Sequence, residues 1–246
     1  MTLQHLNHLG LRITWLGHST FLLELPSGKR VLIDPWVDSN PACPEAFHGL
    51  QADVVLCTHG HGDHIGDLKA VMQRGEPTLV AIYELVSWAV GGGVPGDRVI
   101  GMNKGGRVRL DGLDVIMTDA RHSSAWIDEE GVTYLGEAAG FVLQLASGVS
   151  IYVAGDTSLF RDMQTIAELY RPDVAILPIG DLYTMDPEQA AIAAQWLGVR
   201  AVIPCHYGTF PALTGTPQAL EAALAKRGLA VDVLAMEPGQ TLGEPG

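Results

Sequence analysis

Three histidines and one aspartate lie within six residues of one another, directly after a short apolar run. The run covers residues 54–57, and the polar residues that follow are His59, His61, Asp63 and His64, with glycines between them. Strands end at sheet edges, so we expect this loop at the rim of a sheet, where functional sites are commonly built. Packing does not readily explain so many imidazoles and a carboxylate in one loop, whereas a metal site does.

The spacing inside the loop predicts two groups of ligands. If the chain enters the loop extended, His59 and His61 point in the same direction and can bind one ion. Asp63 and His64, after the bend, can face a neighbouring ion. Imidazole nitrogen and carboxylate oxygen are typical ligands of zinc, and the intervening glycines should allow backbone conformations closed to other residues. The alternative reading is a solvated, histidine-rich turn.

Further polar residues follow other apolar runs of the chain, and each is a candidate metal ligand. They are His122 after residues 115–118, Asp156 after residues 150–154 and His206 after residues 201–205. A lone histidine is more often a surface or core residue, but three candidates at equivalent strand ends favour convergence on one sheet edge. Cys57 and Cys205 flank ligand positions, and we interpret them as small buried residues at strand ends.

The apolar pattern predicts an α/β protein. Short runs rich in Val, Ile and Leu predict strands at residues 11–16, 21–25, 31–33, 54–57, 79–82, 115–118, 141–145, 150–154, 174–177 and 201–205. Helices are predicted at residues 65–74, 84–90, 161–170, 188–197 and 218–226. The pattern is similar in residues 11–110 and 111–246. We therefore predict two sheets packed face to face with helices outside, a four-layer αββα sandwich formed by residues 1–246 as a single domain.

Composition restricts the class of partner and the compartment. The net charge of −13 repels phosphate backbones, so no nucleic-acid partner is expected, and no apolar run is long enough for a membrane span. Residues 1–10 lack the pattern of a secretory signal, and three scattered cysteines argue against a disulfide framework. We expect a cytoplasmic protein with a small-molecule substrate, and a homo-oligomer is a reasonable prior.

Together with motifs elsewhere in the chain, the loop resembles the signature H-x-H-x-D-H of the metallo-β-lactamase superfamily. The chain is most similar to a branch of bacterial and archaeal metal-dependent hydrolases related to L-ascorbate-6-phosphate lactonase. The motifs are Trp15-Leu16-Gly17-His18-Ser19, Ile33-Asp34-Pro35, residues 58–67, Gly101-Met102-Asn103-Lys104-Gly105-Gly106, His122-Ser123-Ser124, Gly136-Glu137, Gly155-Asp156-Thr157, Leu177-Pro178-Ile179-Gly180 and His206-Tyr207-Gly208-Thr209-Phe210-Pro211.

The resemblance implies the αββα fold and two divalent metal ions at one edge of the sheets. It assigns the first ion to His59, His61 and His122, the second to Asp63, His64 and His206, and a bridging position to Asp156. Asp34 would support the metal loop by hydrogen bonding, and His18 matches a histidine near the metals. Val153 and Ala138 depart from the histidine and proline expected in close relatives, and neither position is a ligand.

The chemistry expected at such a site is hydrolysis by a metal-bound hydroxide, of a small ester, lactone, amide or phosphoester. Asp63 could accept the remaining proton of the nucleophile. His18 could donate a proton to the oxyanion or leaving group, or instead orient other groups. Lys104 could bind an anionic substrate group or be an exposed turn residue, and Tyr207 could line the pocket or pack in the core. Zinc is the expected metal, and Mn²⁺, Fe²⁺ and Ni²⁺ also suit these ligands.

Three other functions fit the sequence less well. A phosphodiesterase or nuclease is disfavoured by the acidic charge. Reduction of oxygen or nitric oxide by a di-iron site normally needs a carboxylate between the first two histidines, where this chain has Gly60. A metal-binding regulatory protein without turnover remains an alternative, although a complete ligand set with an open coordination position favours chemistry.

Overall fold

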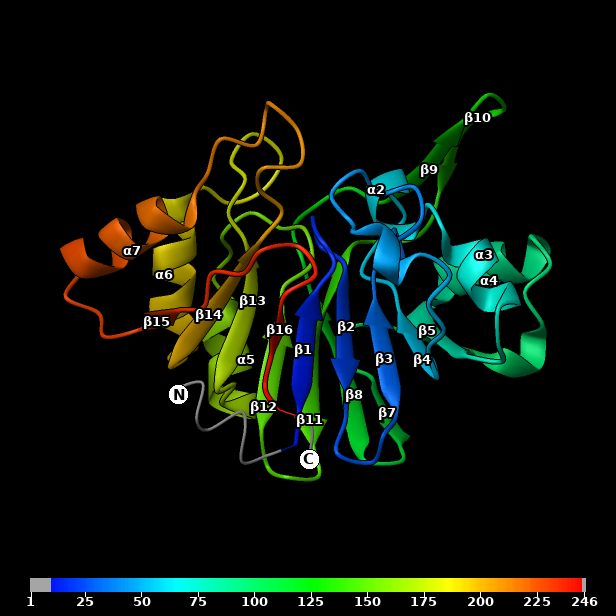
Figure 1. Ribbon diagram of the computed structural model, residues 1–246, viewed down its shortest axis with the longest axis horizontal. Coiled ribbons are helices and arrows are strands. Elements are labelled where there is room, and N and C mark those ends of the chain that lie inside the picture. Colours follow the sequence, from blue (N-terminus) through cyan, green and yellow to red (C-terminus); the bar gives the residue numbers. More distant parts are fainter. Residues whose placement is uncertain (1–9, 245–246) are drawn as a thin grey trace.

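The computed structural model describes residues 10–244, which form two seven-stranded sheets, one separate two-stranded ribbon and helices on both outer sides. Figure 1 shows the two sheets packed against each other, with β1, β2 and β3, all within residues 12–33, in front of β11, β8 and β7, all within residues 107–145. It also shows α3 (Leu68–Gln73) and α4 (Tyr83–Gly91) on one side and α6 (Pro187–Leu197) and α7 (Pro217–Lys226) on the other. The predicted four-layer sandwich is confirmed. Residues 1–9, on which the prediction about a secretory signal mainly rests, lie outside the described residues.

The first sheet combines antiparallel and parallel pairing. Its strand order is β16 (Thr241–Leu242), β1 (Arg12–Trp15), β2 (Phe21–Glu24), β3 (Arg30–Ile33), β4 (Val54–Leu56), β5 (Thr78–Ile82) and β6 (Val99–Met102). Neighbours are antiparallel from β16 to β3 and parallel from β3 to β6. Parallel neighbours need crossover connections, and α4 is one of them, between β5 and β6.

The second sheet repeats this order of pairings. It runs β7 (Arg107–Leu110), β8 (Leu113–Asp119), β11 (Ala139–Leu145), β12 (Ser150–Val153), β13 (Val174–Pro178), β14 (Ala201–Cys205) and β15 (Asp232–Val233). Neighbours are antiparallel from β7 to β12 and parallel from β12 to β15. The pattern that suggested two similar halves therefore corresponds to two sheets with the same sequence of strand pairings.

Both faces of the second sheet are buried, and side chains alternate between two hydrophobic clusters. Ile151 and Val153 of β12 pack into the cluster between the sheets, whereas Tyr152 packs into the cluster beneath α5 (Met163–Tyr170), α6 and α7. Successive side chains of a strand point to opposite faces, which explains why the strands of this sheet are continuously apolar.

Two details of the predicted organisation are wrong. The helix predicted over residues 65–74 is two helices, α2 (Gly62–Ile65) and α3, because Asp67 between them is tied to another loop. Its carboxylate accepts hydrogen bonds from the backbone N–H groups of Val37 and Ser39. The predicted division of the chain into residues 11–110 and 111–246 does not match the two sheets. β7, which ends at residue 110, belongs to the second sheet, and β16, near the end of the described residues, belongs to the first.

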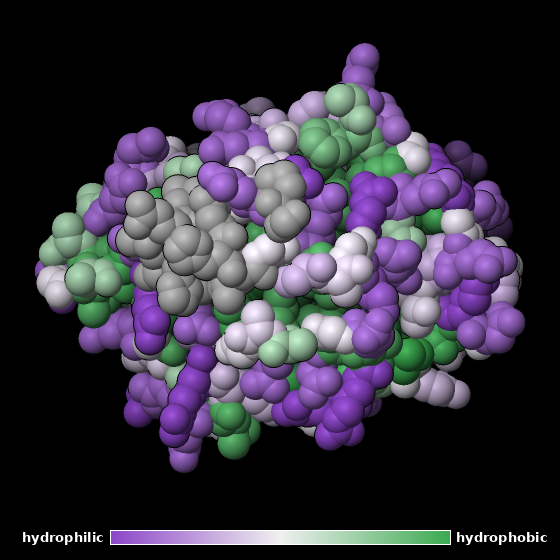
Figure 2. All heavy atoms as spheres, turned by 60° about the horizontal axis from the view of Figure 1, so that its bottom comes forward, coloured by the Kyte–Doolittle hydropathy of each residue, from purple (hydrophilic) through white to green (hydrophobic). Residues whose placement is uncertain are grey.

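The remaining elements lie outside the two sheets. They are the ribbon of β9 (Ala125–Asp128) and β10 (Gly131–Tyr134), and the short 3₁₀ helices η1 (Glu45–Phe47) and η2 (Gly96–Arg98). On the face shown in Figure 2, hydrophilic residues cover most of the surface with hydrophobic residues between them. Within residues 10–244, none of the helices has the length and apolar character needed to cross a membrane.

Candidate metal centre

The candidate ligands lie at the carboxyl ends of strands that run in the same direction. In the first sheet β1, β3 and β4 share one direction, because β2 is antiparallel to both of its neighbours. In the second sheet β8, β12 and β14 share one direction for the same reason. The residues that follow these strands are His18 (β1), Asp34 (β3), His59 (β4), His122 (β8), Asp156 (β12) and His206 (β14).

One group of histidines contains His59, His61 and His122. Their ligand atoms all lie within 4.8 Å of one another. Nε2 of His59 is 3.0 Å from Nδ1 of His61, and the ring of His122 is 5.1 Å from each of the other two rings. Three imidazoles that face one point at this distance are suited to a single ion.

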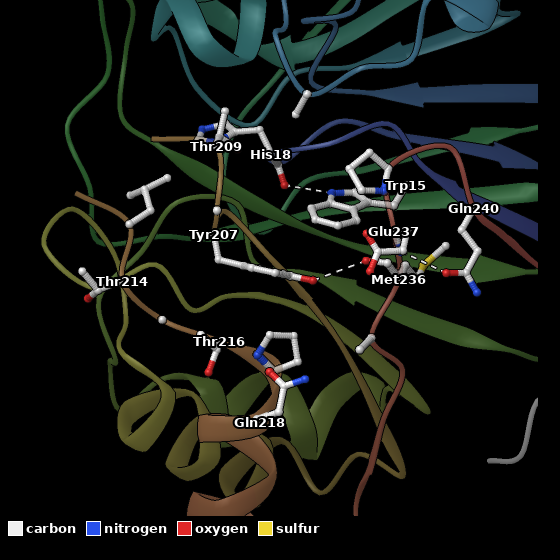
Figure 3. Close-up of a pocket in the computed structure, with 17 residues that line it drawn as sticks. Trp15, His18, Tyr207, Thr209, Thr214, Thr216, Gln218, Met236, Glu237 and Gln240 are labelled. Atoms are coloured by element: carbon white, nitrogen blue, oxygen red, sulfur yellow. Dashed lines mark hydrogen bonds between the residues drawn. The ribbon is translucent and has the colours of Figure 1, made fainter. Parts of the chain in front are cut away.

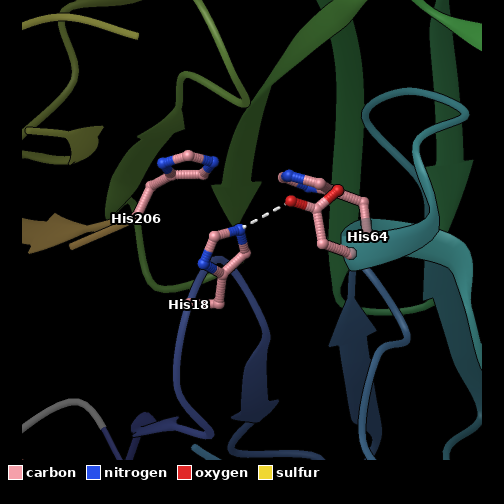
Figure 4. A group of neighbouring side chains, drawn as sticks. His18, His64 and His206 are labelled. Carbon is pink, nitrogen blue, oxygen red and sulfur yellow. Dashed lines mark hydrogen bonds and ion pairs between the residues drawn. The ribbon is translucent and has the colours of Figure 1, made fainter. Parts of the chain in front are cut away.

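A second group contains His18, Asp63, His64 and His206, whose ligand atoms also lie within 4.8 Å of one another. Nε2 of His18 is 3.2 Å from Oδ2 of Asp63, and the rings of His18 and His206 are 4.1 Å apart. Figure 4 shows these side chains converging from the end of β1, from α2 and from the end of β14.

Asp156 lies between the two groups. Its Oδ2 is 3.0 Å from Nε2 of His206, 3.3 Å from Nε2 of His64 and 3.6 Å from Nε2 of His122. The side chain is buried, and its ligand atom also lies within 4.8 Å of those of His59 and His64. A carboxylate that contacts members of both groups has the position that a bridging ligand needs.

Asp34 and Thr58 fix the orientation of two of these histidines. The Asp34 carboxylate accepts hydrogen bonds from the Thr58 backbone N–H (2.7 Å), the Thr58 hydroxyl (2.8 Å) and Nδ1 of His64 (2.8 Å). The Thr58 hydroxyl proton is thus used, so Thr58 Oγ1, 3.0 Å from Nδ1 of His59, accepts a hydrogen bond from that nitrogen. Both rings are protonated at Nδ1, which leaves Nε2 free for a metal.

Burial keeps the first group of imidazoles in the neutral form that metals bind. Burial lowers the pKa of His59 well below its usual value, and it also lowers the pKa values of His61 and His122. Burial lowers the pKa of His18 to about 4, against the opposing effect of the hydrogen bond that His18 donates to Asp63. These groups are therefore ready to bind a cation at neutral pH.

The carboxylates have the opposite balance. Burial raises the pKa of Asp156, but the charges of His206 and His64 more than offset it and hold the pKa well below the ordinary value. Burial likewise raises the pKa of Asp63, but the hydrogen bond with His18 and the charges of His64 and His18 together outweigh burial and lower the pKa. Burial lowers the pKa of His64, but Asp156 and Asp34 raise it by more, so the net shift of this pKa is upward. Without a cation, this buried site places a positive charge on His64.

The donor set fits divalent metal ions. Among the described residues, the buried atoms Nε2 of His64 and Oδ1 of Asp156 have no hydrogen-bond partner. Nε2 of His64 lies 3.3 Å from Oδ2 of Asp156 without hydrogen-bond geometry. Buried polar atoms that lack a partner are costly, and a metal ion between them would satisfy both. Cys57 and Cys205 are buried, and burial raises both thiol pKa values well above normal, so neither offers a thiolate.

Left-handed backbone conformations concentrate at this site. Of five described non-glycine residues with positive φ, three belong here: Asp34 (50°), His18 (54°) and His206 (54°). Such conformations cost energy and cluster at functional sites. Gly60 and Gly62, in contrast, have no positive φ, so the expected reason for glycine is wrong there. At position 60 there is instead no room for a side chain, because a Cβ would lie 2.7 Å from the side chain of Leu135.

A cavity of about 580 Å³ adjoins His18 on the side of the loop that follows β14. Figure 3 shows Tyr207 and Trp15 lining it, and their rings stack with centroids 5.2 Å apart. The Tyr207 hydroxyl donates to the carbonyl of Met236 (3.4 Å). Tyr207 therefore lines a pocket, one of the two positions considered for it.

Lys104 lies in the turn between β6 and β7 and is neutralised by two carboxylates. Its Nζ contacts Asp119 and is 2.8 Å from Glu137. Burial lowers the pKa of Lys104, but these two carboxylates outweigh it and raise the pKa. The ammonium group is thus held in an ion pair.

Two supporting residues were not assigned a role from the sequence. Thr58 connects Asp34 to His59, and Thr209 places its hydroxyl 3.1 Å from Nδ1 of His18. Thr58 directly precedes the metal loop, so its position was a usable signal. Thr209 is 191 residues from His18 in the chain, and no local pattern links the two.

Comparison with known sequences shows a beta-lactamase superfamily domain and similarity to metal-dependent hydrolases. Residues 29–207 match the family model described as a beta-lactamase superfamily domain. A protein of Koribacter versatilis named UPF0173 metal-dependent hydrolase is 49% identical over 233 residues, with 94% of this chain and 97% of the relative covered. A protein with the same name from Methanopyrus kandleri is 42% identical, with 94% and 99% covered.

A similar fold is found among solved structures. Igni18, described as a metallo hydrolase from the archaeon Ignicoccus hospitalis, has a TM-score of 0.82 and 38% sequence identity. The match covers 94% of this chain and 97% of Igni18.

Proposed function

Because this chain belongs to the metallo-β-lactamase superfamily and is a metal-dependent hydrolase of the UPF0173 group, we propose that it uses two zinc ions to hydrolyse a small, uncharged ester, lactone or amide. The observation that carries the proposal is the convergence of seven histidine and aspartate side chains into two adjacent groups that share Asp156. Three imidazoles with room for a further ligand are typical of catalytic zinc.

The proposed ligands follow the two groups. His59, His61 and His122 hold the first ion, Asp63, His64 and His206 hold the second, and Asp156 contacts both. When bound, the ions lower the pKa of a water molecule to about 7 and polarise the substrate oxygen. The zinc assignment follows from neutral imidazole nitrogens and carboxylate oxygens as donors, a set that manganese, iron and nickel also accept.

Asp63 is the proposed catalytic carboxylate. Its side chain is 32% exposed, whereas those of His64 and His206 in the same group are at most 3% exposed. Its lowered pKa keeps it ionised at neutral pH, so it accepts a hydrogen bond from a water molecule at the opening. Asp63 thereby orients the nucleophile, and because its lowered pKa makes it a weak base, orientation rather than proton uptake is its proposed role.

The residues that line the cavity beside His18 favour an uncharged substrate over a phosphate ester. Within the described part of the chain, the residues that line the 580 Å³ cavity include no lysine or arginine, and Glu237 lies at its wall. Lys104 and Arg121 both pair with Asp119, so their charges are already balanced. An anionic group remote from the reacting bond would find no free cation in the cavity, whereas Trp15 and Tyr207 offer aromatic surface.

Metal analysis combined with turnover tests the metal role. His61→Ala removes one ligand of the first group, and His48→Ala, an exposed histidine outside both groups, is the matched control. Purified His61→Ala protein should lose about one equivalent of zinc and all detectable turnover, and the control should keep both. Full activity in metal-free His61→Ala protein would contradict the proposal.

A substrate panel tests the proposed class. Neutral esters, lactones and amides are compared at equal concentration with phosphodiesters and single-stranded nucleic acid, using fully metallated protein and His61→Ala as the blank. Hydrolysis confined to the neutral compounds supports the proposal. Phosphodiester cleavage alone would favour the phosphodiesterase alternative, which the net charge of −13 disfavours for polyanionic substrates.

A further inference from the structure

The two groups of candidate ligands differ in their access to solvent. In the second group His18 and His64 have fully buried side chains and His206 is 3% exposed. In the first group His61 is partly exposed and the side chain of His122 is 14% exposed. The three imidazoles of the second group are thus enclosed by protein, and Asp63, whose side chain is 32% exposed, is the member of that group that reaches the opening.

His18 belongs to the second group by its geometry. Its Nε2 is 3.2 Å from Asp63, and its ring centroid is 4.1 Å from that of His206 and 5.6 Å from that of His64. In Figure 4 the His18 ring lies between His206 and His64 and points toward the space they enclose. A ligand atom of His18 is within 4.8 Å of those of the other three members.

Burial argues against direct contact between His18 and a substrate. Both ring nitrogens have partners inside the protein, Asp63 at Nε2 and Thr209 at Nδ1. A general acid must be within hydrogen-bond reach of the group that it protonates. A fully buried ring whose ligand atom lies within 4.8 Å of those of three other candidate ligands is better placed to bind an ion among them.

The backbone places His18 before any metal binds. Its carbonyl accepts hydrogen bonds from the His206 backbone N–H (3.0 Å) and from Nε1 of Trp15 (3.0 Å). The proton that Nε2 donates to Asp63 is the one that a metal ion would replace, and the Thr209 hydroxyl can then accept from Nδ1–H.

We propose that His18 is a fourth protein ligand of the second ion, which makes the two metal sites unequal. Besides the shared Asp156, the second site then has four ligands, His18, Asp63, His64 and His206, and the first site has three, His59, His61 and His122. The site with the additional imidazole holds its ion more tightly, and the other holds its ion more weakly. This inference rests on the proposed metal pair.

Measured zinc affinities test directly whether the two metal sites differ. Apoprotein is titrated with zinc against a chromophoric chelator, which resolves two dissociation constants. In the wild type they should differ by about 100-fold or more. His18→Asn, which tolerates the left-handed backbone, should weaken the tighter site by about 100-fold or more, above the 10- to 100-fold typical of losing a ligand's hydrogen-bond partner. His48→Ala should change neither constant.

A second measurement does not depend on the folding of a His18 variant. His61→Ala protein loaded with one equivalent of zinc should hold it in the second site. X-ray absorption should then count three imidazoles around the ion if His18 is a ligand, and two if it is not. Circular dichroism of each apoprotein confirms that it is folded.

The outcomes separate this inference from the proposed function. Failure of the wild type to bind zinc would overturn both. Two bound ions of equal affinity, or two imidazoles in the His61→Ala protein, would overturn the inference alone and leave the metal-dependent hydrolase with a symmetric pair. Two unequal constants, with the tighter one lost in His18→Asn, support it.

Discussion

The backbone N–H of His206 donates a 3.0 Å hydrogen bond to the backbone carbonyl of His18. His18 follows β1 of the first sheet and His206 follows β14 of the second, so this bond joins the sheets at the candidate metal centre. Both residues have φ of 54°. The second group of ligands is thus held in place by both halves of the sandwich, whose relative position is part of the geometry of the site.

Thr209→Val should weaken the second site selectively. The substitution keeps the side-chain shape but removes the hydroxyl partner of Nδ1 of His18, so the ring loses its orientation. We expect the tighter zinc dissociation constant to rise about 10- to 100-fold and the weaker one to stay within about twofold. Chelator competition measures both. Thr214→Val, in the same cavity wall, is the control, and equal losses at both sites would contradict the prediction.

Asp34→Asn should destabilise the metal loop. The carboxylate accepts three hydrogen bonds, from the backbone and hydroxyl of Thr58 and from His64. In the side chain of the variant, an NH₂ group replaces one of the two acceptor oxygens and faces groups that also donate. We expect this to lower the free energy of unfolding by about 1–3 kcal/mol.

Chemical denaturation of the apoprotein measures that loss, and zinc stoichiometry should fall with it. Asp111→Asn is the control, because the Asp111 side chain is 88% exposed and should change the free energy of unfolding by less than about 0.5 kcal/mol. An Asp34→Asn protein as stable as this control would show that the three bonds contribute little.

Gly180→Ala should displace His206. A Cβ at position 180 would lie 2.1 Å from the His206 carbonyl oxygen and 3.2 Å from its Nδ1. The backbone after β14 would have to move, so we expect a loss of about 1–3 kcal/mol in stability and weaker binding of the second ion. Thermal unfolding and chelator competition measure the two effects. Gly91→Ala, where a Cβ would meet no atom within 4 Å, should leave both unchanged.

Stability of the metal-free protein should fall with acidification. The pKa of His18 is about 4 in the folded protein and 6.5 when exposed, so the unfolded chain binds more protons between these values. The free energy of unfolding therefore decreases as pH falls from about 6.5 to about 4, by up to roughly 3 kcal/mol from this residue.

Denaturation of the apoprotein at pH 7.5, 6 and 5 tests this, with His18→Asn expected to show a shallower dependence. His48→Ala, an exposed position, should follow the wild type. Identical slopes in the wild type and His18→Asn would refute the assignment of this dependence to His18. His64, with its raised pKa, contributes in the opposite direction in both proteins.

The strands and the convergence of the candidate site were predictable because their signals are local. Each buried strand is a short apolar run, and His59, His122, Asp156 and His206 follow such runs directly. Parallel strands present their carboxyl ends at the same edge, so strand order alone brings these side chains together. The helices predicted at residues 188–197 and 218–226 are α6 and α7, and the side chains of Asp186 and Thr216 that precede them accept backbone hydrogen bonds at their first turns.

Other features depend on partners far away in the chain. The ribbon of β9 and β10 has mostly exposed residues and no apolar run, so its pairing was not predicted. The break between α2 and α3 follows from hydrogen bonds between Asp67 and residues 37–39, which a helical pattern does not contain. The position of His18 came only from resemblance, because its neighbours Asp63, His206 and Thr209 all lie far from it in the chain.

The return of β16 to the first sheet has a consequence for biosynthesis. β16 pairs with β1, with Ile13 opposite Leu242 and Thr14 hydrogen-bonded to Thr241 through their hydroxyls (2.7 Å). Ribosomes add residues from the amino end, so β1 is synthesised long before β16, the strand that covers its edge. All candidate metal ligands, from His18 to His206, also precede β16 in the chain. The edge of β1 therefore stays unpaired during synthesis until β16 emerges, although the residues of the candidate centre have by then all been made.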